Sequence, residues 1–402
     1  MLFINFTFML LSYLIFNVNS ELCTYNSKKK YSDLIIKYPE LTEQFNFMSQ
    51  YPIPIWYTDK SSSSLNEIKD TLQNCQQSTS TIIIYGMVNR DCGSGESAGG
   101  SNKNSNDYTD FITNLHKEVN DRNIIYIVEP DALALSMNNK CGVGNNYINY
   151  IKIAIDILSQ NKNANIYLDI GYWVLIYDEQ QVKDIIKIIN IIDPNKKIKG
   201  FSLNLSNYRS NAEMIASCKK IRDFSGYQYK CIIDTSRNAN GPDDKNTWCN
   251  AKNAGIGTIP IENPGNDIID YFMWLKPAIE VDGHCYNFEN SFHSSQSAGG
   301  YDPEYFKLLW NNRLLKINNK NNQNNNTQNN DINNNDKTQN NIFLYDDLIK
   351  NNPFNSMESQ CNSDDNVCKD NVNKRRDAYN KMNTNINFDK KNNNKNSLRC
   401  NE

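Results

Sequence analysis

Short apolar runs alternate with amphipathic stretches between about residues 50 and 311. The runs are rich in Ile, Val and Tyr and have the length of buried strands. They are Ile53–Tyr57, Thr81–Tyr85, Ile124–Glu129, Asn165–Asp169, Gly200–Asn204, Tyr229–Asp234, Gly257–Ile261 and Tyr271–Leu275. Between them, apolar residues recur every three or four positions, which predicts helices with one buried face. The clearest helical stretches are Tyr108–Val119, Tyr147–Leu158 and Val182–Ile189. This alternation predicts an α/β fold with a parallel sheet, either a barrel or a doubly wound sheet.

A polar or charged residue stands at or just after the end of most predicted strands. In a parallel barrel the carboxyl ends of all strands open into one cavity, so such residues converge there. A single acidic residue at a strand end is often only the N-cap of the next helix. Recurrence in almost every unit is harder to explain by capping, and it favours a barrel. The residues concerned are Asp91, Asp131, Asp169, Asn204, Asp234 and Lys276.

The first twenty residues have the features of a secretory signal peptide. Their apolar run ends near Phe16, which is short for a membrane span. The small residues Val18 and Ser20 precede a cleavage point before Glu21. Because no Lys or Arg stands before the apolar run, an uncleaved anchor is the alternative. We predict a secreted, extracellular protein with no membrane association after cleavage.

The chain divides into five segments. Residues 1–20 are the signal peptide, 21–49 an N-terminal extension, and 50–317 a single barrel domain. Residues 318–342 are nearly all Asn and other polar residues, so they cannot bury an apolar core and should be disordered. Residues 343–402 hold a closing segment and a polar, cysteine-containing tail.

Charge and cysteine content narrow the class of protein. A net charge of −3 without a basic stripe argues against nucleic acid as a partner. Eleven cysteines behind a signal peptide indicate disulfides, and the odd number leaves at least one thiol free or paired between chains. A metal site is the competing interpretation, but the spacings lack a paired C-x-x-C and there are only three histidines. We expect a monomer without metal or cofactor.

Four segments bring carboxylates to the ends of predicted strands. Glycoside hydrolysis needs one carboxyl group that protonates the leaving oxygen and another that activates water or stabilises the positive charge on the sugar. Burial and a second carboxylate nearby raise the pKa of such an acid. Taken alone, acidic clusters equally fit metal sites or solvated loops. The acidic residues expected to cluster are Asp91, Asp131, Asp169 and Asp282.

These segments resemble glycoside hydrolase family 6, the family of cellulose-cutting endoglucanases and cellobiohydrolases. The shared motifs are Asn-Arg-Asp-Cys at 89–92, Glu-Pro-Asp-Ala-Leu at 129–133, Tyr-Leu-Asp-x-Gly at 167–171 and Lys-Pro-x-x-Glu-x-Asp-Gly at 276–283. Four shorter matches bring the number of motifs in family order to eight, over roughly residues 50 to 311. The resemblance implies a distorted parallel (β/α) barrel and inverting hydrolysis of β-1,4-glucan (cellulose) without a cofactor.

The resemblance also implies roles for single residues. Asp131 matches the general acid, and Asp91 matches the second carboxylate, which keeps that acid protonated. Asp282 matches a proposed base whose assignment is debated within the family. Tyr85 matches the tyrosine that crowds the sugar at the cleavage point. Substrate-binding positions, including two tryptophan stacking platforms, are expected at Trp56, Arg90, Asp169, Asn204, Trp248, Lys276 and Glu280.

The family also implies disulfides at loops beside the cleft. They join the positions of Cys92 and Cys141, and those of Cys249 and Cys285. A third bridge, between Cys218 and Cys231, would link a helix to the next strand.

The length of one loop bears on the mode of cleavage. Only Gly283 and His284 separate Asp282 from Cys285, where exo-acting members carry a long loop that closes a tunnel. We therefore predict an open cleft and endoglucanase action. The alternatives are a cellobiohydrolase of the same family and a non-catalytic glucan-binding wall protein.

Overall fold

The computed structural model describes residues 21–137, 140–176, 178–242 and 247–314. The predicted signal peptide, the Asn-rich segment and the closing segment with its tail lie outside these residues. Within the described part of the chain, no helix combines the length and the apolar character needed to cross a membrane.

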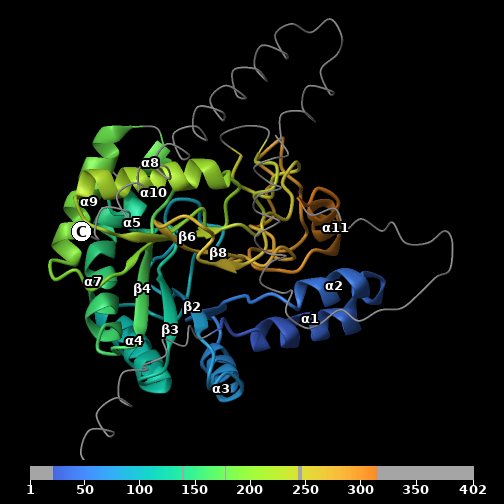
Figure 1. Ribbon diagram of the computed structural model, residues 1–402, viewed down its shortest axis with the longest axis horizontal. Helices are drawn as coiled ribbons and strands as arrows, with labels where there is room; N and C mark the ends of the chain where they lie inside the picture. Colours follow the sequence, from blue (N-terminus) through green and yellow to red (C-terminus); the bar gives the residue numbers. More distant parts are fainter. Residues whose placement is uncertain (1–20, 138–139, 177, 243–246, 315–402) are drawn as a thin grey trace, which may run out of the picture. The chain divides into compact units, whose positions relative to one another are not determined.

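Eight strands form one sheet in the order β1-β2-β3-β4-β5-β6-β8-β7. Figure 1 labels β2, β3, β4, β6 and β8 of this sheet. Neighbouring strands from β1 to β8 run parallel, and only β7 is antiparallel to its neighbour. Because consecutive strands are joined by helical connections, most strands lie beside their neighbour in sequence. The strands are β1 Ile55–Thr58, β2 Ser80–Tyr85, β3 Ile124–Val128, β4 Ala164–Asp169, β5 Gly200–Leu203, β6 Lys230–Asp234, β7 Ile261–Glu262 and β8 Ile269–Met273.

The sheet curls until its two ends approach each other. Inward side chains from β2, β3, β4, β6 and β8, with Leu205 just after β5, pack into one buried cluster, and Trp56 of β1 is partly buried against it. The indole Nε1 of Trp56 donates a hydrogen bond of 3.1 Å to the backbone oxygen of Leu275, just after β8. This bond joins the first strand to the last without a strand ladder between them. The predicted parallel barrel is thus confirmed, in its distorted form.

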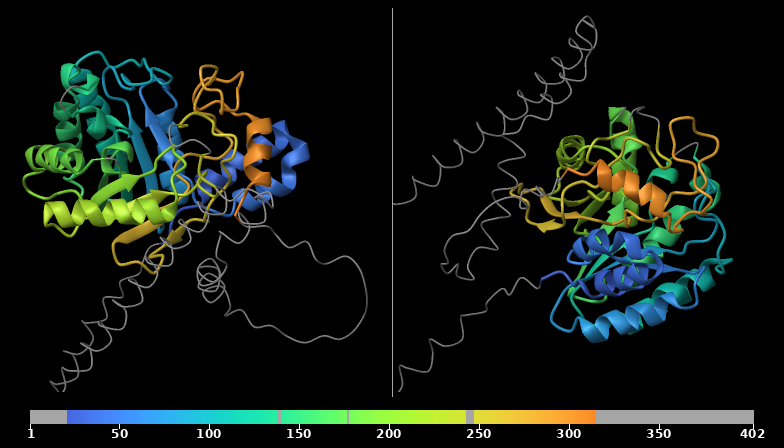
Figure 2. Two further views of the ribbon diagram at one scale, coloured as in Figure 1. Left: turned by 90° about the horizontal axis from the view of Figure 1, so that it is seen from above. Right: turned by 90° about the vertical axis from the view of Figure 1, so that its right-hand side faces the viewer.

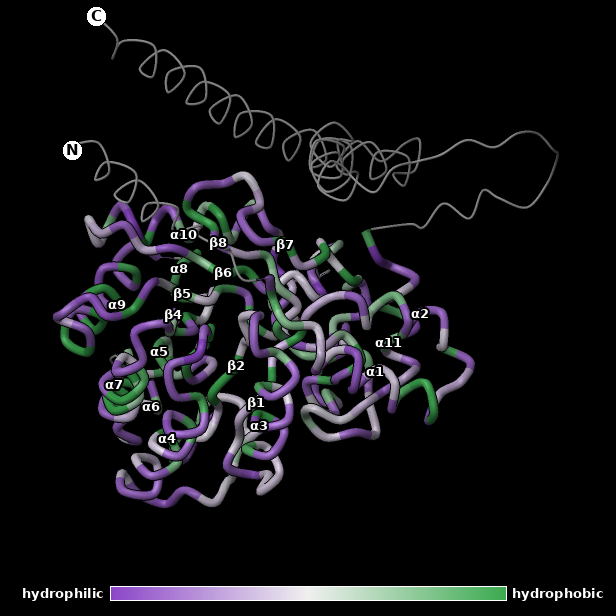
Figure 3. Tube along the Cα trace, turned by 60° about the horizontal axis from the view of Figure 1, so that its bottom comes forward, coloured by the Kyte–Doolittle hydropathy of each residue, from purple (hydrophilic) through white to green (hydrophobic). Residues whose placement is uncertain are grey.

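The outer face of the sheet is covered by helices in the order of the strands that they connect (Figure 1). Their apolar faces form the largest buried cluster with the sheet, and hydrophobic and hydrophilic positions alternate along them (Figure 3). These helices are α3 Ser64–Asn74, α4 Ser105–Val119, α7 Tyr147–Leu158, α9 Glu179–Ile192 and α10 Asn211–Ser225. Three short helices lie in the connections: α5 Ala132–Leu135, α6 Cys141–Gly144 and α8 Trp173–Ile176.

Local sequence fixes the ends of α10. The hydroxyl of Ser210 accepts from the Glu213 amide, and the Glu213 carboxylate accepts from the Ser210 amide, which satisfies two otherwise unpaired donors. Gly226 ends the helix with φ at 65°, a left-handed conformation that suits glycine.

One predicted strand is largely wrong. Of the run Gly257–Ile261, only the last residue enters the sheet, as part of β7. The rest is buried through single contacts; for example, the backbone oxygen of Thr258 accepts from the hydroxyl of Thr235 at 2.7 Å. Pro260 has no N–H to offer a ladder. An apolar run therefore indicated burial correctly but could not distinguish a strand from an irregular buried segment.

The N-terminal extension is helical and packed. Helices α1 (Tyr25–Lys37) and α2 (Thr42–Met48), with the 3-10 turn Pro39–Leu41 between them, lie beside the last helix, α11 (Pro303–Asn311), in all three views (Figures 1 and 2). The ring of Phe45 on α2 lies 5.1 Å from that of Phe306 on α11, within a second buried cluster. The extension therefore shares a core with the segment that follows the sheet.

Four disulfides cross-link the described chain. They are Cys23–Cys75, Cys92–Cys141, Cys218–Cys231 and Cys249–Cys285. The first ties the start of the extension to the end of α3. The second joins the loop after β2 to the start of α6, and the fourth joins the segments that follow β6 and β8.

Candidate active site

Asp91 follows β2 in a loop that binds its own carboxylate. One carboxylate oxygen accepts from the Ser94 hydroxyl and the other from the Ser97 amide, both at 2.6 Å. The backbone at Asp91 is left-handed, with φ at 56°, which turns the chain sharply as the strand ends. The carboxylate is thereby buried and held in one orientation.

Arg90 helps to hold the Asp91 loop in place. Its guanidinium pairs with Asp59, its Nε donates to the backbone oxygen of Ser97 at 3.2 Å, and it lies 5.1 Å from the centre of the Tyr85 ring. Asp59 also accepts from the Asn102 amide at 2.8 Å. Arg90 is only 2% exposed. The structure therefore buries this predicted substrate-binding residue among contacts with Asp59 and the Asp91 loop. Asp59 carried no distinguishing sequence signal.

Asp131 follows β3, also in a left-handed conformation, with φ at 67°. Its amide donates to the Asp169 carboxylate at 2.8 Å, which links the ends of β3 and β4. Burial, followed by the negative charges of Asp91 and Asp282, raises the pKa of Asp131 to about 7. A substantial fraction of this side chain is therefore protonated at neutral pH, and it can act as an acid there.

Asp169 and Tyr85 border this acid. Burial, and then the neighbouring Asp131, raises the pKa of Asp169 well above its ordinary value. Burial, followed by the charges of Asp91 and Asp131, raises the pKa of the Tyr85 phenol. The phenol stays neutral, and its ring meets the Trp56 ring edge-on with centres 5.9 Å apart.

Asp282 accepts four hydrogen bonds through its carboxylate. It accepts from the Tyr208 hydroxyl at 2.5 Å, from both terminal nitrogens of Arg237 at 2.9 and 3.0 Å, and from the Asn250 amide at 3.0 Å. Tyr208 and Arg237 end two of the four shorter family-like segments, Asn204–Tyr208 and Ile233–Arg237, but neither residue was predicted to have a role. The contacts of Tyr208 and Arg237 with Asp282 form only when the chain after β5, the chain after β6 and the loop held by the Cys249–Cys285 disulfide come together in the fold.

Asp234, at the end of β6, positions the next strand end rather than facing substrate. Its carboxylate accepts from the amides of Leu275 and Lys276, both at 3.2 Å, and from the Ser206 amide at 3.1 Å. It is 1% exposed. Its role is to fix the direction in which the chain leaves β8.

Trp56, Lys276 and Glu280 form one group beside the carboxylates. The ammonium of Lys276 lies 5.5 Å from the centre of the Trp56 ring and 3.8 Å from the Glu280 carboxylate. Burial lowers the pKa of Lys276 below its ordinary value. An aromatic face, a cation and an anion are thus gathered where the first and last strands meet.

Asn204 and Trp248, two other residues predicted to bind substrate, lie outside the group formed by Trp56, Lys276 and Glu280. Asn204 is 1% exposed, and its side-chain amide forms hydrogen bonds with the backbone of Arg209 and with the backbone oxygen of Asp234. No part of it is left for a ligand. Trp248 is partly exposed and meets the Phe288 ring edge-on at 5.1 Å, next to the Cys249–Cys285 bridge.

Glu129 is a buried carboxyl that sequence reasoning placed in a motif without a role. It accepts from the Tyr108 hydroxyl at 2.8 Å and from the Gly86 amide at 3.1 Å. A Cβ at Gly86 would lie 2.5 Å from the Phe111 ring, so glycine is needed there. Burial raises the pKa of Glu129 to about 7, despite these hydrogen bonds. Glu129 holds the turn that carries Tyr85 into the Asp91 loop.

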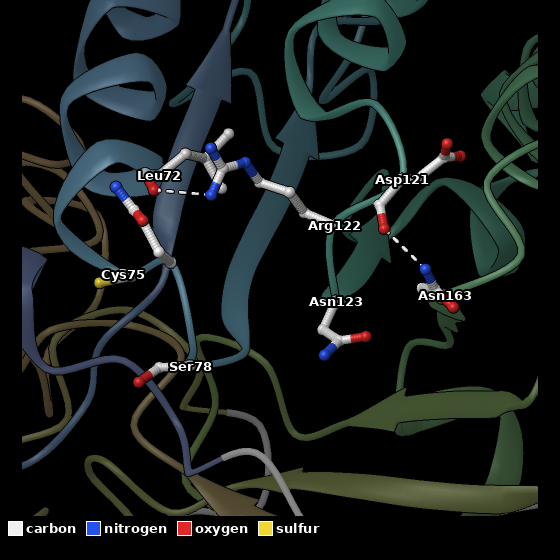
Figure 4. A pocket seen from close by; sticks show the side chains of 8 residues that line it. Leu72, Cys75, Ser78, Asp121, Arg122, Asn123 and Asn163 are labelled. Atoms are coloured by element: carbon white, nitrogen blue, oxygen red, sulfur yellow. Dashed lines mark hydrogen bonds between the residues drawn. The ribbon is translucent and has the colours of Figure 1, made fainter.

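A separate hollow of about 260 Å³ lies at the opposite edge, where β2, β3 and β4 begin (Figure 4). Its polar groups largely bind one another: Arg122 donates to the Leu72 backbone at 3.0 Å and Asn163 to the Asp121 backbone at 2.6 Å. It contains none of the clustered carboxylates. Over the residues described, no set of three or more His, Cys, Asp or Glu side chains is grouped to hold a metal ion.

The raised pKa of Glu129 predicts a pH-dependent cost to stability. Ionising this side chain costs free energy only in the folded state, so the free energy of unfolding should fall as pH rises from about 4.5 towards about 7. Glu129→Gln removes this cost and keeps an acceptor for Gly86. The difference in free energy of unfolding between the variant and the wild type should therefore grow, in favour of the variant, by roughly 2–3 kcal/mol as the pH rises from 5 to 8. Urea unfolding at each pH measures this difference. The exposed Glu289→Gln is the control; a gain for Glu129→Gln no larger than the control's would contradict the assignment.

Comparison with known proteins gives consistent matches. The model of glycosyl hydrolases family 6 matches residues 18–313. Endoglucanase A of Thermobispora bispora is 30% identical over 242 residues, 58% of this chain and 51% of that protein. A probable 1,4-β-D-glucan cellobiohydrolase C of Aspergillus niger is 26% identical over 280 residues, 58% of this chain and 60% of that protein. The chain thus spans about half the length of the curated relatives that it matches.

A solved structure agrees with these matches. The endoglucanase Cel6 of Mycobacterium tuberculosis, in complex with methyl-cellobiosyl-4-deoxy-4-thio-β-D-cellobioside, superimposes with a TM-score of 0.57 at 25% identity. The match covers 67% of this chain and 89% of that one. With a family model that matches about three quarters of its length, and with this fold, the chain belongs to glycosyl hydrolase family 6.

Proposed function

We propose that this protein is a secreted, inverting glycoside hydrolase that cleaves internal β-1,4-glucosidic bonds of cellulose or a related β-glucan. One observation carries the proposal. Asp131 lies at the rim of a barrel, with a pKa raised to about 7 by burial and by two other carboxylates. A carboxyl group that is still protonated near neutral pH is what protonation of a glycosidic oxygen requires.

In the proposed reaction, Asp131 donates its proton to the oxygen that links two glucose units. The bond to the anomeric carbon breaks as positive charge develops on the ring, and a water molecule attacks from the opposite face. Asp91 keeps Asp131 protonated by repulsion, orients this water and accepts the proton that the water loses as the new C–O bond forms. That proton then passes to solvent, and Asp131 is reprotonated for the next turnover. The neutral Tyr85 phenol crowds the ring and favours its distortion.

Asp282 is better suited to stabilising charge than to accepting a proton. Four hydrogen bonds, two of them from a guanidinium, occupy its oxygens. Three of these bonds end on Oδ2 and one on Oδ1, so neighbouring side chains and backbone fix the carboxylate in one orientation. We therefore assign Asp282 as a fixed negative charge near Asp131, and we regard its role as the base as the less supported alternative.

Substrate binding is assigned to the group at the closure of the barrel. The faces of Trp56 and Trp248 suit the apolar faces of glucose rings, and Lys276 and Glu280 offer a donor and an acceptor for sugar hydroxyl groups. The Mycobacterium tuberculosis relative was solved with a thio-linked cello-oligosaccharide, which supports a β-1,4-glucan as the ligand here.

The short connection after Asp282 supports an endo mode of attack. Two residues span at most about 10 Å, and the disulfide between Cys249 and Cys285 ties this connection down. A Cβ at Gly283 would lie 2.3 Å from a carboxylate oxygen of Glu96, so the two rims approach there through one exposed side chain. We propose an open cleft, with a cellobiohydrolase as the competing assignment.

Secretion rests on the leader and the disulfides. Four bridges in the described chain are typical of proteins that fold in an oxidising compartment. They are rare in reducing cytosol, and they support the predicted export through residues 1–20.

Replacement of the acid tests the function. Asp131→Ala should lower turnover of carboxymethyl cellulose by about 10²–10⁴-fold, the usual contribution of general acid catalysis. Turnover of 2,4-dinitrophenyl cellobioside should fall less, because its leaving group needs little protonation. Asp121→Ala, at the opposite edge of the barrel, is the control and should act as wild type. Near wild-type cleavage of cellulose by Asp131→Ala would remove the assignment of the acid.

The mode of cleavage is tested by viscosity. An open cleft accepts a chain anywhere along its length, so viscosity of carboxymethyl cellulose should fall rapidly for each reducing end released. Cellobiose should not be the only early product. If viscosity barely changes while cellobiose accumulates, the protein is instead a cellobiohydrolase.

A further inference from the structure

An ammonium group from the N-terminal extension reaches the proposed substrate-binding group. Lys30, on α1, donates to one carboxylate oxygen of Glu280 at 2.7 Å across 250 residues of sequence. The side chains of Lys30 and Glu280 are only 17% and 10% exposed. Ion pairs on open surfaces contribute little, but a pair this well covered is screened far less by solvent.

The pair belongs to a small, ordered arrangement. Lys30 also lies 5.6 Å from the centre of the Tyr301 ring, and Tyr301 forms a β-bridge with Glu280. Burial is the largest single influence and lowers the pKa of Lys30, but attraction to Glu280 and Tyr301 and the hydrogen bond to Glu280 together outweigh it, so the net shift is upward. Lys30 is therefore a permanent cation at this position.

Glu280 stands between two cations at unequal distances. Its Oε1 is 2.7 Å from Lys30, whereas its Oε2 is 3.8 Å from Lys276. The first distance is that of a strong charge-assisted hydrogen bond, and the second is too long for one. Lys276 therefore keeps hydrogen-bond donors that the carboxylate does not use.

We propose that Lys30 is a positioning residue that holds Glu280 apart from Lys276, so that both remain free to bind sugar hydroxyl groups. The inference rests on the proposed function, which makes Lys276 and Glu280 ligands of the glucan. Without Lys30, the carboxylate has one cation left in reach, and the two would close into a direct pair. A sugar would then have to break that pair before binding.

This role predicts a specific change in kinetics. Lys30→Met should raise KM for cello-oligosaccharides about tenfold, because a sugar must displace an ionic hydrogen bond, and should change kcat much less. Lys30→Arg retains the cation and should restore KM to within about twofold. Lys29→Met is the matched control, because the neighbouring Lys29 pairs with Asp70 away from the site and should leave KM unchanged. Lys30→Gln serves as a second neutral variant in case Met impairs folding, which melting temperatures would reveal.

The decisive readout is a double-mutant cycle with Glu280→Gln, using the full chain and cellotetraose to cellohexaose as substrates. If Lys30 acts through Glu280, then Lys30→Met should have little further effect on KM in the Glu280→Gln background. Additive effects on KM, or a wild-type KM for both neutral Lys30 variants, would overturn the inference while leaving the hydrolase assignment intact. Absence of hydrolysis by the wild type itself would instead contradict the proposed function, and the inference with it.

Discussion

The cost of burying several carboxyl groups at one rim of the barrel is the constraint on which the site depends. A buried carboxyl group needs hydrogen-bond partners in place of the water that it loses. Asp91 receives them from its own loop, Asp282 from Arg237 and Tyr208, and Asp234 from the amides that follow β8. Asp131 is acted on mainly by burial and then by negative neighbours, which together raise its pKa to about 7. An acid near neutral pH is therefore a consequence of how the surrounding charges are satisfied.

The distorted closure of the barrel brings the other half of the site together. β1 and β8 share no ladder, and the Trp56 indole joins β1 to the chain that leaves β8. Lys276 and Glu280 then lie beside that ring, and Lys30 reaches the same place from α1. The N-terminal helices thus belong to the architecture that shapes the proposed binding group, in addition to sharing a core with α11.

The sequence predicted those parts of this arrangement that leave a local pattern. Buried strands and one-sided helices follow from residue periodicity, and acidic residues at strand ends suggested the barrel and its site. Gly257–Ile261 was misjudged as a strand because burial alone makes a run apolar. Asp59 and Lys30 were missed because their importance lies in partners 31 and 250 residues away. Asn204 is an error of the opposite kind. It was predicted to bind substrate because it is a polar residue at a strand end, but it is buried and forms hydrogen bonds within the protein.

The central claim is that burial, together with neighbouring carboxylates, raises the pKa of Asp131 to about 7. It can be measured directly by ¹³C NMR titration of the full chain labelled at the aspartate carboxyl carbons, with Asp131→Asn used to assign the signal. In wild type the Asp131 signal should titrate with a pKa of about 7. Asp91→Asn removes one negative charge and should move that pKa towards the ordinary value of 3.8, while Asp121→Asn should not. An Asp131 pKa near 4 in wild type, or one unchanged by Asp91→Asn, would contradict the account.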